Sequence, residues 1–307
     1  MRVFSTCWNG RRHTDGAAMI DEILALGFDR VELSHGMSVS LLPGILGRVK
    51  EKAVTVAGLH NFFPAPLDVR GDSPDAFQFT SHRPAERRRA LDLSKRTIDQ
   101  AASFGARYVV LHMGSVPLFR SKDGSRLLEA RARRGFLDSR EYAELKGKIV
   151  RRRRRLAPLY VERALIALRE LADYAGGTGV TLGVEARSHL EQVPDEEEME
   201  LFMREFADVP HVGYWHDFGH VQRKHNLLLL DHRQFLGRMR PYLVGGHVND
   251  VRWPDRDHRV PFDGGVDFEG LCALFTPEMP LTWELSSSRS AGEIAAAAVR
   301  WEALIGK

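Results

Sequence analysis

TLGVEAR, at residues 181–187, is the stretch that decides the fold: a mostly apolar, β-prone run that leads to the carboxylate of Glu185. Three later stretches repeat this pattern: WHDFGH at 215–220, GHVND at 246–250 and TWELS at 282–286. They bring in side chains that can bind a metal ion, namely Asp217 with His220, then His247, then Glu284. Four such runs in series predict successive parallel strands that deliver these side chains to one rim.

The rest of the chain extends this alternation of strands and helices. Strands are predicted at 2–8, 29–35, 53–60, 107–112, 180–186, 212–217, 242–248 and 280–285. Helical patterns separate them, including one at 161–175 and one at 227–239, and residues 61–84 are predicted to form a long loop. Eight alternations indicate a single-domain (β/α)8 TIM barrel over residues 1–307, with active side chains at the carboxyl ends of the strands.

Composition excludes several classes of protein. The chain has 307 residues, of which 43% are hydrophobic and 28% charged, which is typical of a globular protein with a large core. We expect no membrane span, because no apolar run reaches 18 residues, and no signal peptide, because the N-terminus soon turns polar. Only Cys7 and Cys272 occur, which favours a cytoplasmic location. The Gly-rich nicotinamide fingerprint after the first strand is missing.

Basic residues are concentrated in one segment. Residues 116–157 contain 14 Lys and Arg and 5 Asp and Glu, a balance of 14 − 5 = +9, whereas the remainder carries 30 basic and 36 acidic residues, or −6. We predict a helical insertion here after strand four, broken near Gly135 and Pro158. The run Arg151–Arg155 is consistent with a nucleic-acid partner, or with an exposed helical face that pairs with acidic neighbours or with another subunit.

The acidic strand ends favour a metal ion. Burying a lone carboxylate costs several kcal/mol, so something positive should face Glu185 and Glu284 within their apolar strands. Taken singly, such a Glu is most often salt-bridged and such a His is a hydrogen-bonded core residue, but four in register predict one shared divalent ion. His216 should point away from the site. The remaining histidines are expected at the surface or in loops: His13, His82, His189, His211, His225 and His232.

With these residues in view, the chain resembles the xylose isomerase-like barrels, a superfamily of sugar isomerases and epimerases. The resemblance covers nearly the whole chain. It rests on an ordered set of motifs: GFDRVEL (27–33), FGARYVVLHMGS (104–115), GVEAR (183–187), DFGH (217–220), HVND (247–250), HRVPFDGGVDFEGL (258–271) and WEL (283–285). No single motif is decisive, but the order is specific.

The resemblance implies roles for individual residues. It implies one divalent ion, Mn²⁺, Co²⁺ or Mg²⁺, held by Glu185, Asp217, His247 and Glu284. The two glutamates would also act as acid and base, moving a proton through a metal-stabilised enediolate of a carbohydrate substrate. Candidate substrate-binding residues are His220, Arg187, His60, His112, His258, Trp8 and His35, with Trp8 offering a flat surface to a sugar ring. A homo-oligomer is left open.

Other functions remain open. Related apurinic endonucleases use three zinc ions and share most of this ligand set, including His258. They place Asp-x-His where this chain has Asp255-Arg256-Asp257-His258, which is a different spacing. Other relatives are dehydratases or lyases of sugar derivatives with the same ligands. A barrel without activity that binds a partner through Arg151–Arg155 is a further reading, which the intact ligand set disfavours.

Overall fold

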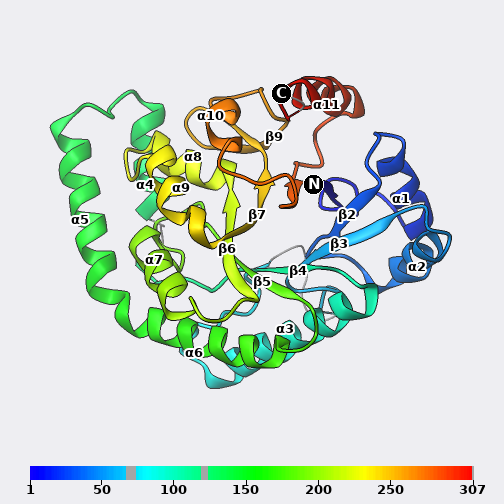
Figure 1. Ribbon diagram of the computed structural model, residues 1–307. Coiled ribbons are helices and arrows are strands. Elements are labelled where there is room, and N and C mark those ends of the chain that lie inside the picture. Colours follow the sequence, from blue (N-terminus) through cyan, green and yellow to red (C-terminus); the bar gives the residue numbers. More distant parts are fainter. Residues whose placement is uncertain (67–73, 119–123, 306–307) are drawn as a thin grey trace.

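The computed structural model describes residues 1–66, 74–118 and 124–305, which form a ring of strands surrounded by helices (Figure 1). Within these ranges, eight parallel strands close in the order β1-β10-β7-β6-β5-β4-β3-β2. Their bounds are β1 (Arg2–Ser5), β2 (Arg30–Leu33), β3 (Thr55–His60), β4 (Tyr108–Leu111), β5 (Thr181–Glu185), β6 (Val212–Asp217), β7 (Leu243–Val248) and β10 (Leu281–Trp283). The predicted (β/α)8 barrel is therefore confirmed.

Helices cover the outside of the barrel. They are α1 (Gly16–Leu24), α2 (Leu42–Lys50), α3 (Pro84–Phe104), α4 (Gly124–Arg133), α5 (Arg140–Leu156), α6 (Pro158–Ala175), α7 (Glu196–Glu205), α8 (Phe218–Asn226), α9 (His232–Met239), α10 (Phe268–Cys272) and α11 (Ala291–Ile305), with short 3-10 turns η1 (Val39–Leu41) and η2 (Arg240–Tyr242). Most of their apolar faces pack toward the strands and form the main core, whereas α5 packs on α4 and α6. No helix in the described ranges is both long and apolar enough to cross a membrane.

Aromatic rings fill the barrel interior one layer below the strand ends. Trp215 lies two residues before Asp217 on β6, and together with Tyr108 it belongs to a small buried inner cluster. Glycines on neighbouring strands make room for these rings. A Cβ at Gly58 would lie 2.2 Å from the Tyr108 ring, and one at Gly245 would lie 2.3 Å from the Trp215 ring. The interior below the rim is therefore packed.

The helix after strand six differs from the prediction. In place of one helix at 227–239, α8 begins directly after β6 and α9 follows from His232. The reason is that Asp217 is the N-cap of α8, because its Oδ1 accepts a hydrogen bond from the His220 backbone N–H at 2.7 Å. A carboxylate in this position satisfies an otherwise unpaired donor of the first helical turn. One residue thus ends a strand and starts a helix.

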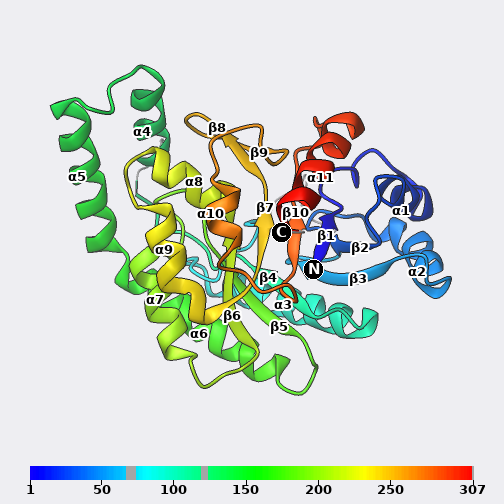
Figure 2. The same ribbon diagram turned by 45° about the horizontal axis from the view of Figure 1, so that its top comes forward.

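A hairpin that the sequence reading did not predict follows β7. It consists of the antiparallel strands β8 (Asp250–Arg252) and β9 (Arg256–Arg259), in the upper middle of Figure 2. Its strands are short and rich in charge, so they carry no apolar alternation that would reveal them. The hairpin matters because it brings Asp257 and His258 to the barrel mouth.

The basic insertion forms α4 and α5, at the left edge of Figure 2. The predicted breaks are present, since the chain leaves helix between Arg133 and Arg140, and α6 begins at Pro158; residues 119–123 of this segment lie outside the described ranges. Helix α4 lies beside α8, where Glu129 accepts a hydrogen bond from Arg223 at 2.7 Å. The insertion is therefore attached to the helix that Asp217 caps.

The arginine run is not a uniform basic face. The side chain of Arg153 is only 1% exposed, and it forms ion pairs with Asp195 at 2.8 Å and with Glu198. Arg154 pairs with Glu197 on the same neighbouring segment. The structure thus agrees with the expected pairing of the run with acidic neighbours.

His232 was expected at the surface and is buried instead. Its Nε2 lies 3.0 Å from Nε2 of His216, and its Nδ1 lies 2.9 Å from Oε1 of Gln222. His216 also contacts the Tyr214 hydroxyl at 2.7 Å. A single polar residue at the start of a helix gives no sign of such a buried hydrogen-bonded chain, which explains the wrong prediction.

Candidate metal centre

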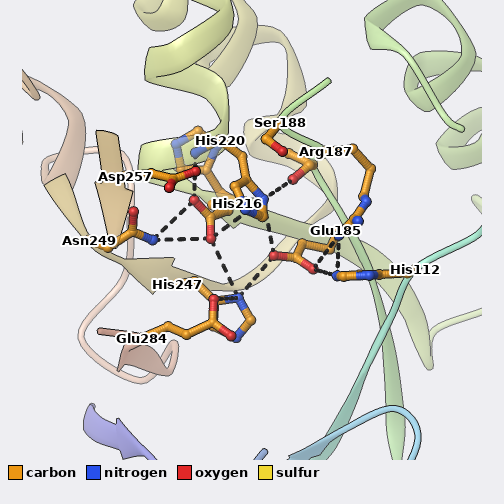
Figure 3. A network of polar contacts seen from close by, with 12 residues as sticks. His112, Glu185, Arg187, Ser188, His216, His220, His247, Asn249, Asp257 and Glu284 are labelled. Atoms are coloured by element: carbon orange, nitrogen blue, oxygen red, sulfur yellow. Dashed lines mark hydrogen bonds and ion pairs between the residues drawn. The ribbon is translucent and has the colours of Figure 1, made fainter. Parts of the chain in front are cut away.

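The four predicted ligands converge at the carboxyl ends of their strands. Glu185 ends β5, Asp217 ends β6, His247 lies near the end of β7, and Glu284 directly follows β10. One ligand atom from each lies within 4.8 Å of those of the other three, and all four residues are buried. Figure 3 shows Glu185, His247 and Glu284 close together at this point. The sequence reading and the structure agree on this juxtaposition.

The Nδ1 atom of His247 faces the three carboxylates. It lies 3.1 Å from Glu185 Oε1, 3.4 Å from Glu284 Oε2 and 3.7 Å from Asp217 Oδ2. Burial alone would lower the pKa of His247, but Glu284, Glu32 and the hydrogen bond to Glu185 raise it well above its ordinary value. A positive charge is therefore favoured at the point where the carboxylates meet.

The carboxylates themselves differ in protonation. Burial acts to raise the pKa of Glu284, but His247 and His258 lower it to about 2. Burial also acts to raise the pKa of Glu185. The charge of His112 and hydrogen bonds from three imidazoles outweigh it and hold the pKa of Glu185 well below its usual range. Burial and the charge of Glu185 instead raise the pKa of Asp217 to about 8. The four predicted ligands therefore contain three carboxylates and a single imidazole, so their acidic groups outnumber the one base among them.

A divalent cation fits this set of donors. Three carboxylates and one imidazole suit Mn²⁺, Co²⁺, Fe²⁺ or Mg²⁺, and no thiolate is among them. Burial and the charge of Glu185 raise the pKa of Asp217, and a cation would offset both effects, because the ion takes the place of the proton.

Glu32 on β2 supports His247 and was missed in the sequence. Its Oε2 lies 3.1 Å from His247 Nε2, on the side of the ring opposite the other carboxylates, and it also accepts from the Tyr108 hydroxyl at 3.1 Å. A carboxylate behind a ligating imidazole fixes the tautomer and the ring orientation. The signal was present, since Glu32 interrupts the apolar strand of GFDRVEL just as Glu185 interrupts its own.

Asn249 orients Asp217. Its Nδ2 lies 3.2 Å from each carboxylate oxygen of Asp217, and the dashed lines to it are visible in Figure 3. The close approach depends on Gly219, because a Cβ there would lie 1.8 Å from the Asn249 side-chain oxygen. Together with the cap on α8, this contact fixes the Asp217 carboxylate.

His60, His112 and Arg187 surround the far side of Glu185. His60 Nε2 lies 3.5 Å from Glu185 Oε2, Arg187 Nη1 donates to the same oxygen at 3.3 Å, and His112 contacts both Glu185 and Arg187. Asp75 holds this cluster, since its carboxylate lies 3.0 Å from Arg187 Nη2 and 3.2 Å from His112 Nδ1. Asp75 comes from the predicted loop, of which residues 67–73 lie outside the described ranges. The sequence offered no signal for it.

A second cluster lies beside the first. His220 Nδ1 is 3.4 Å from Glu185 Oε1, and ligand atoms of His220, Asp257 and His258 lie within 4.8 Å of one another. Asp257 directly precedes His258, which differs from the Asp-x-His spacing of the nucleases, and its carboxylate nevertheless joins this cluster. His258 has a left-handed backbone, with φ 51°, so its side chain and that of the preceding Asp257 do not follow strict strand alternation.

Comparisons with known proteins agree with this fold. A model of the xylose isomerase-like TIM barrel matches residues 20–302. The chain belongs to this family. A search of curated proteins finds no significant match.

Solved structures from sugar enzymes are similar over almost the full chain. One is a D-tagatose 3-epimerase-like protein, with 14% identity, a TM-score of 0.69 and coverage of 99% of this chain and 97% of the other. An L-ribulose 3-epimerase has 16% identity, a TM-score of 0.68 and coverage of 100% and 94%. A 3-keto-D-glucoside 4-epimerase from E. coli has 15% identity, a TM-score of 0.65 and coverage of 98% and 97%. At these identities the likeness shows the fold.

The family resemblance also assigned Trp8 and His35 to the pocket, and only one of them lies there. Trp8 is 2% exposed, with Arg12 4.3 Å from the centre of its ring and Phe4 packed against it edge to face. This covered ring contradicts the expected surface for a sugar ring. His35 is half-buried and lies beside His60, with ring centres 4.7 Å apart, so it does belong to the mouth.

Proposed function

We propose that this chain is a divalent-metal-dependent isomerase or epimerase of a sugar, a sugar phosphate or a polyol. The observation that carries the proposal is the group of three carboxylates around His247 Nδ1 at the barrel mouth. The similar structures named for epimerases of tagatose, ribulose and a 3-keto-glucoside support it. These are reactions in which a C–H bond is broken and remade on the other face.

The residues at the mouth would have different roles in this reaction. Glu185, Asp217, His247 and Glu284 would hold the cation, which when bound supplies positive charge next to a substrate oxygen. Glu185 and Glu284 have low pKa values and are ionised at neutral pH, so either can accept a proton from a substrate carbon and return it. Arg187 and His112 would bind substrate oxygens beside Glu185.

Deuterium exchange tests this proposal directly. The Mn²⁺-loaded protein is incubated in D₂O with a panel of ketohexoses, ketopentoses and their phosphates, and label at carbon is followed by NMR. We expect exchange with at least one sugar, and a loss of exchange in both Glu185→Gln and Glu284→Gln. Exchange that persists in either variant would remove that glutamate from the proton transfer, and no exchange with any of the sugars would count against the reaction class.

A zinc-dependent nuclease related to the apurinic endonucleases is the second candidate. It is favoured by the cluster of His220, Asp257 and His258, which offers donors for an additional ion. The buried ion pairs of Arg153 weigh against it, because they remove one arginine from any surface for nucleic acid. Cleavage of an abasic DNA duplex, and a DNA affinity that falls steeply with salt and depends on Arg151–Arg155, would favour this candidate.

A dehydratase or lyase of a sugar derivative is a third candidate, because the same ligands and the same first deprotonation would serve it. Product analysis separates it from an epimerase. A dehydratase releases water and leaves a product 18 Da lighter by mass spectrometry, whereas an epimerase leaves the mass unchanged.

A further inference from the structure

A second group of side chains that could bind a metal ion lies at the mouth, on the arc of strands next to the first group. His35 follows β2, His60 ends β3 and Glu284 follows β10, and one ligand atom from each lies within 4.8 Å of the other two. In the barrel, β10, β1, β2 and β3 are consecutive neighbours, whereas the first group comes from β5, β6, β7 and β10. The two groups therefore divide the mouth between them and have Glu284 in common.

The orientation of His60 leaves a nitrogen available. Its Nδ1 donates to the carbonyl oxygen of Asn61 at 3.0 Å, so Nε2 is the nitrogen that can bind an ion, which would replace the proton that this atom shares with Glu185. Nε2 points into the mouth, where it lies 3.5 Å from Glu185 Oε2. A backbone hydrogen bond to the outer nitrogen of an imidazole is the usual support for a ligating histidine.

The two imidazoles have a geometry that suits a shared ion. The ring centres of His35 and His60 are 4.7 Å apart, and the rings are inclined at 73°. Two imidazoles that bind one ion at about 2.1 Å per nitrogen bring their ring centres to roughly 5 Å. By contrast, the rings of His60 and His247 are stacked at 11°, which is a poor arrangement for two ligands that converge on one ion.

Glu284 can serve both groups. Its Oε2 lies 3.4 Å from His247 Nδ1 and belongs to the first group. A carboxylate has a second oxygen with its own lone pairs, and bridging carboxylates of this kind are common where two ions lie about 3.5–4 Å apart.

We propose that His35, His60 and Glu284 form a second divalent-cation site, which shares Glu284 with the first. Two imidazoles and one carboxylate favour Zn²⁺ or Co²⁺ over Mg²⁺, which prefers oxygen ligands alone. Three protein ligands leave the remaining positions to water or to a substrate oxygen. The site is distinct from the cluster of His220, Asp257 and His258, which lies on the other side of Glu185.

Metal titration of the full-length protein tests this site. The metal-free protein is titrated with Zn²⁺ by calorimetry, and bound metal is counted by mass spectrometry after dialysis. We expect about two equivalents in the wild type and about one in His35→Gln, with the remaining ion bound at its original affinity. The matched control is His211→Gln, because His211 precedes β6 at the opposite end of the barrel and should leave both equivalents in place.

The variants also separate this inference from the proposed function. If the wild type binds only one equivalent of Zn²⁺ and Asp217→Asn loses it, the second site is overturned. The first site then still stands. Two equivalents retained in both His35→Gln and His60→Gln would also overturn the second site, and a loss in Asp257→Asn would then place the extra ion in the other cluster. Circular dichroism spectra of each variant establish that the fold is unchanged, and His60→Gln provides an independent test should His35→Gln misfold.

Discussion

The imidazole of His247 is held from behind by Glu32, whose Oε2 lies 3.1 Å from Nε2, while Nδ1 faces three carboxylates. A ring fixed in this way already points its Nδ1 atom at the place where the carboxylates meet. The support comes from β2, a strand that contributes no ligand to the first group. Affinity for the cation should therefore depend on a residue that does not touch it.

Glu32→Gln tests this dependence. The amide keeps the size of the side chain but loses the charge that holds the Nε2 proton, so affinity for Mn²⁺ should fall by about 10- to 100-fold. Calorimetric titration measures it. Glu170→Gln is the control, since Glu170 forms a partly exposed pair with Lys95 at 2.6 Å. Equal affinities in Glu32→Gln and wild type would show that the contact is irrelevant to binding.

Asp217→Asn separates two roles of one residue. Asparagine caps a helix about as well as aspartate, so α8 should persist, whereas a charged ligand is lost. At a free Mn²⁺ concentration near 100 times Kd, the wild type should gain about 2.7 kcal/mol of stability. The variant should gain far less, as measured by denaturant unfolding with and without the ion. An equal gain in both proteins would mean that Asp217 does not bind the cation.

Arg153 should matter far more than its neighbours in the run. Arg153→Ala leaves Asp195 and Glu198 without their partner, and breaking such a buried pair costs about 3–5 kcal/mol. Arg155→Ala, at an exposed position, should change stability by no more than about 0.5 kcal/mol. Urea unfolding of the two variants compares these costs, and similar values would contradict the anchoring role of Arg153.

His232 should make the fold sensitive to acid. Burial lowers its pKa to about 3, so the folded state binds fewer protons than the unfolded state, whose imidazole has a pKa of about 6.5. Its contribution is fully present above pH 6.5 and is lost as the pH falls toward 3, which amounts to about 2 kcal/mol by pH 5. His232→Gln should flatten this part of the pH–stability curve. If its slope matches that of wild type and of the control His211→Gln, protonation of His232 is not the cause.

The barrel and the convergence of its four candidate ligands could be predicted from sequence for a specific reason. In a barrel of this type, strand ends lie on one rim, so Glu185, Asp217, His247 and Glu284 needed only to be recognised as strand ends to be brought together. No contact between distant side chains had to be guessed. Glu32 obeys the same rule and was overlooked because a lone Glu in a strand most often reads as a surface residue.

Other features could not be predicted because they depend on tertiary contacts. Asp75 reaches Arg187 from a loop without a periodic pattern, and the hairpin that carries Asp257 has strands too short and charged to stand out. The start of α8 was missed because its capping residue was interpreted only as a ligand. The burial of His232 depends on partners from β6 and α8, which no local pattern records.

The packed rings of Trp215 and Tyr108 determine the side from which a cation and a substrate can reach the candidate site. Because these rings fill the described interior beneath the strand ends, a cation and a substrate would both enter from the rim that carries the candidate ligands. A cation held by these side chains would lie deeper than the sugar. We therefore expect the cation to bind before the sugar and to dissociate after it. A saturating sugar should then slow the escape of bound Mn²⁺ to a chelator, and an unchanged rate of escape would point to a separate exit.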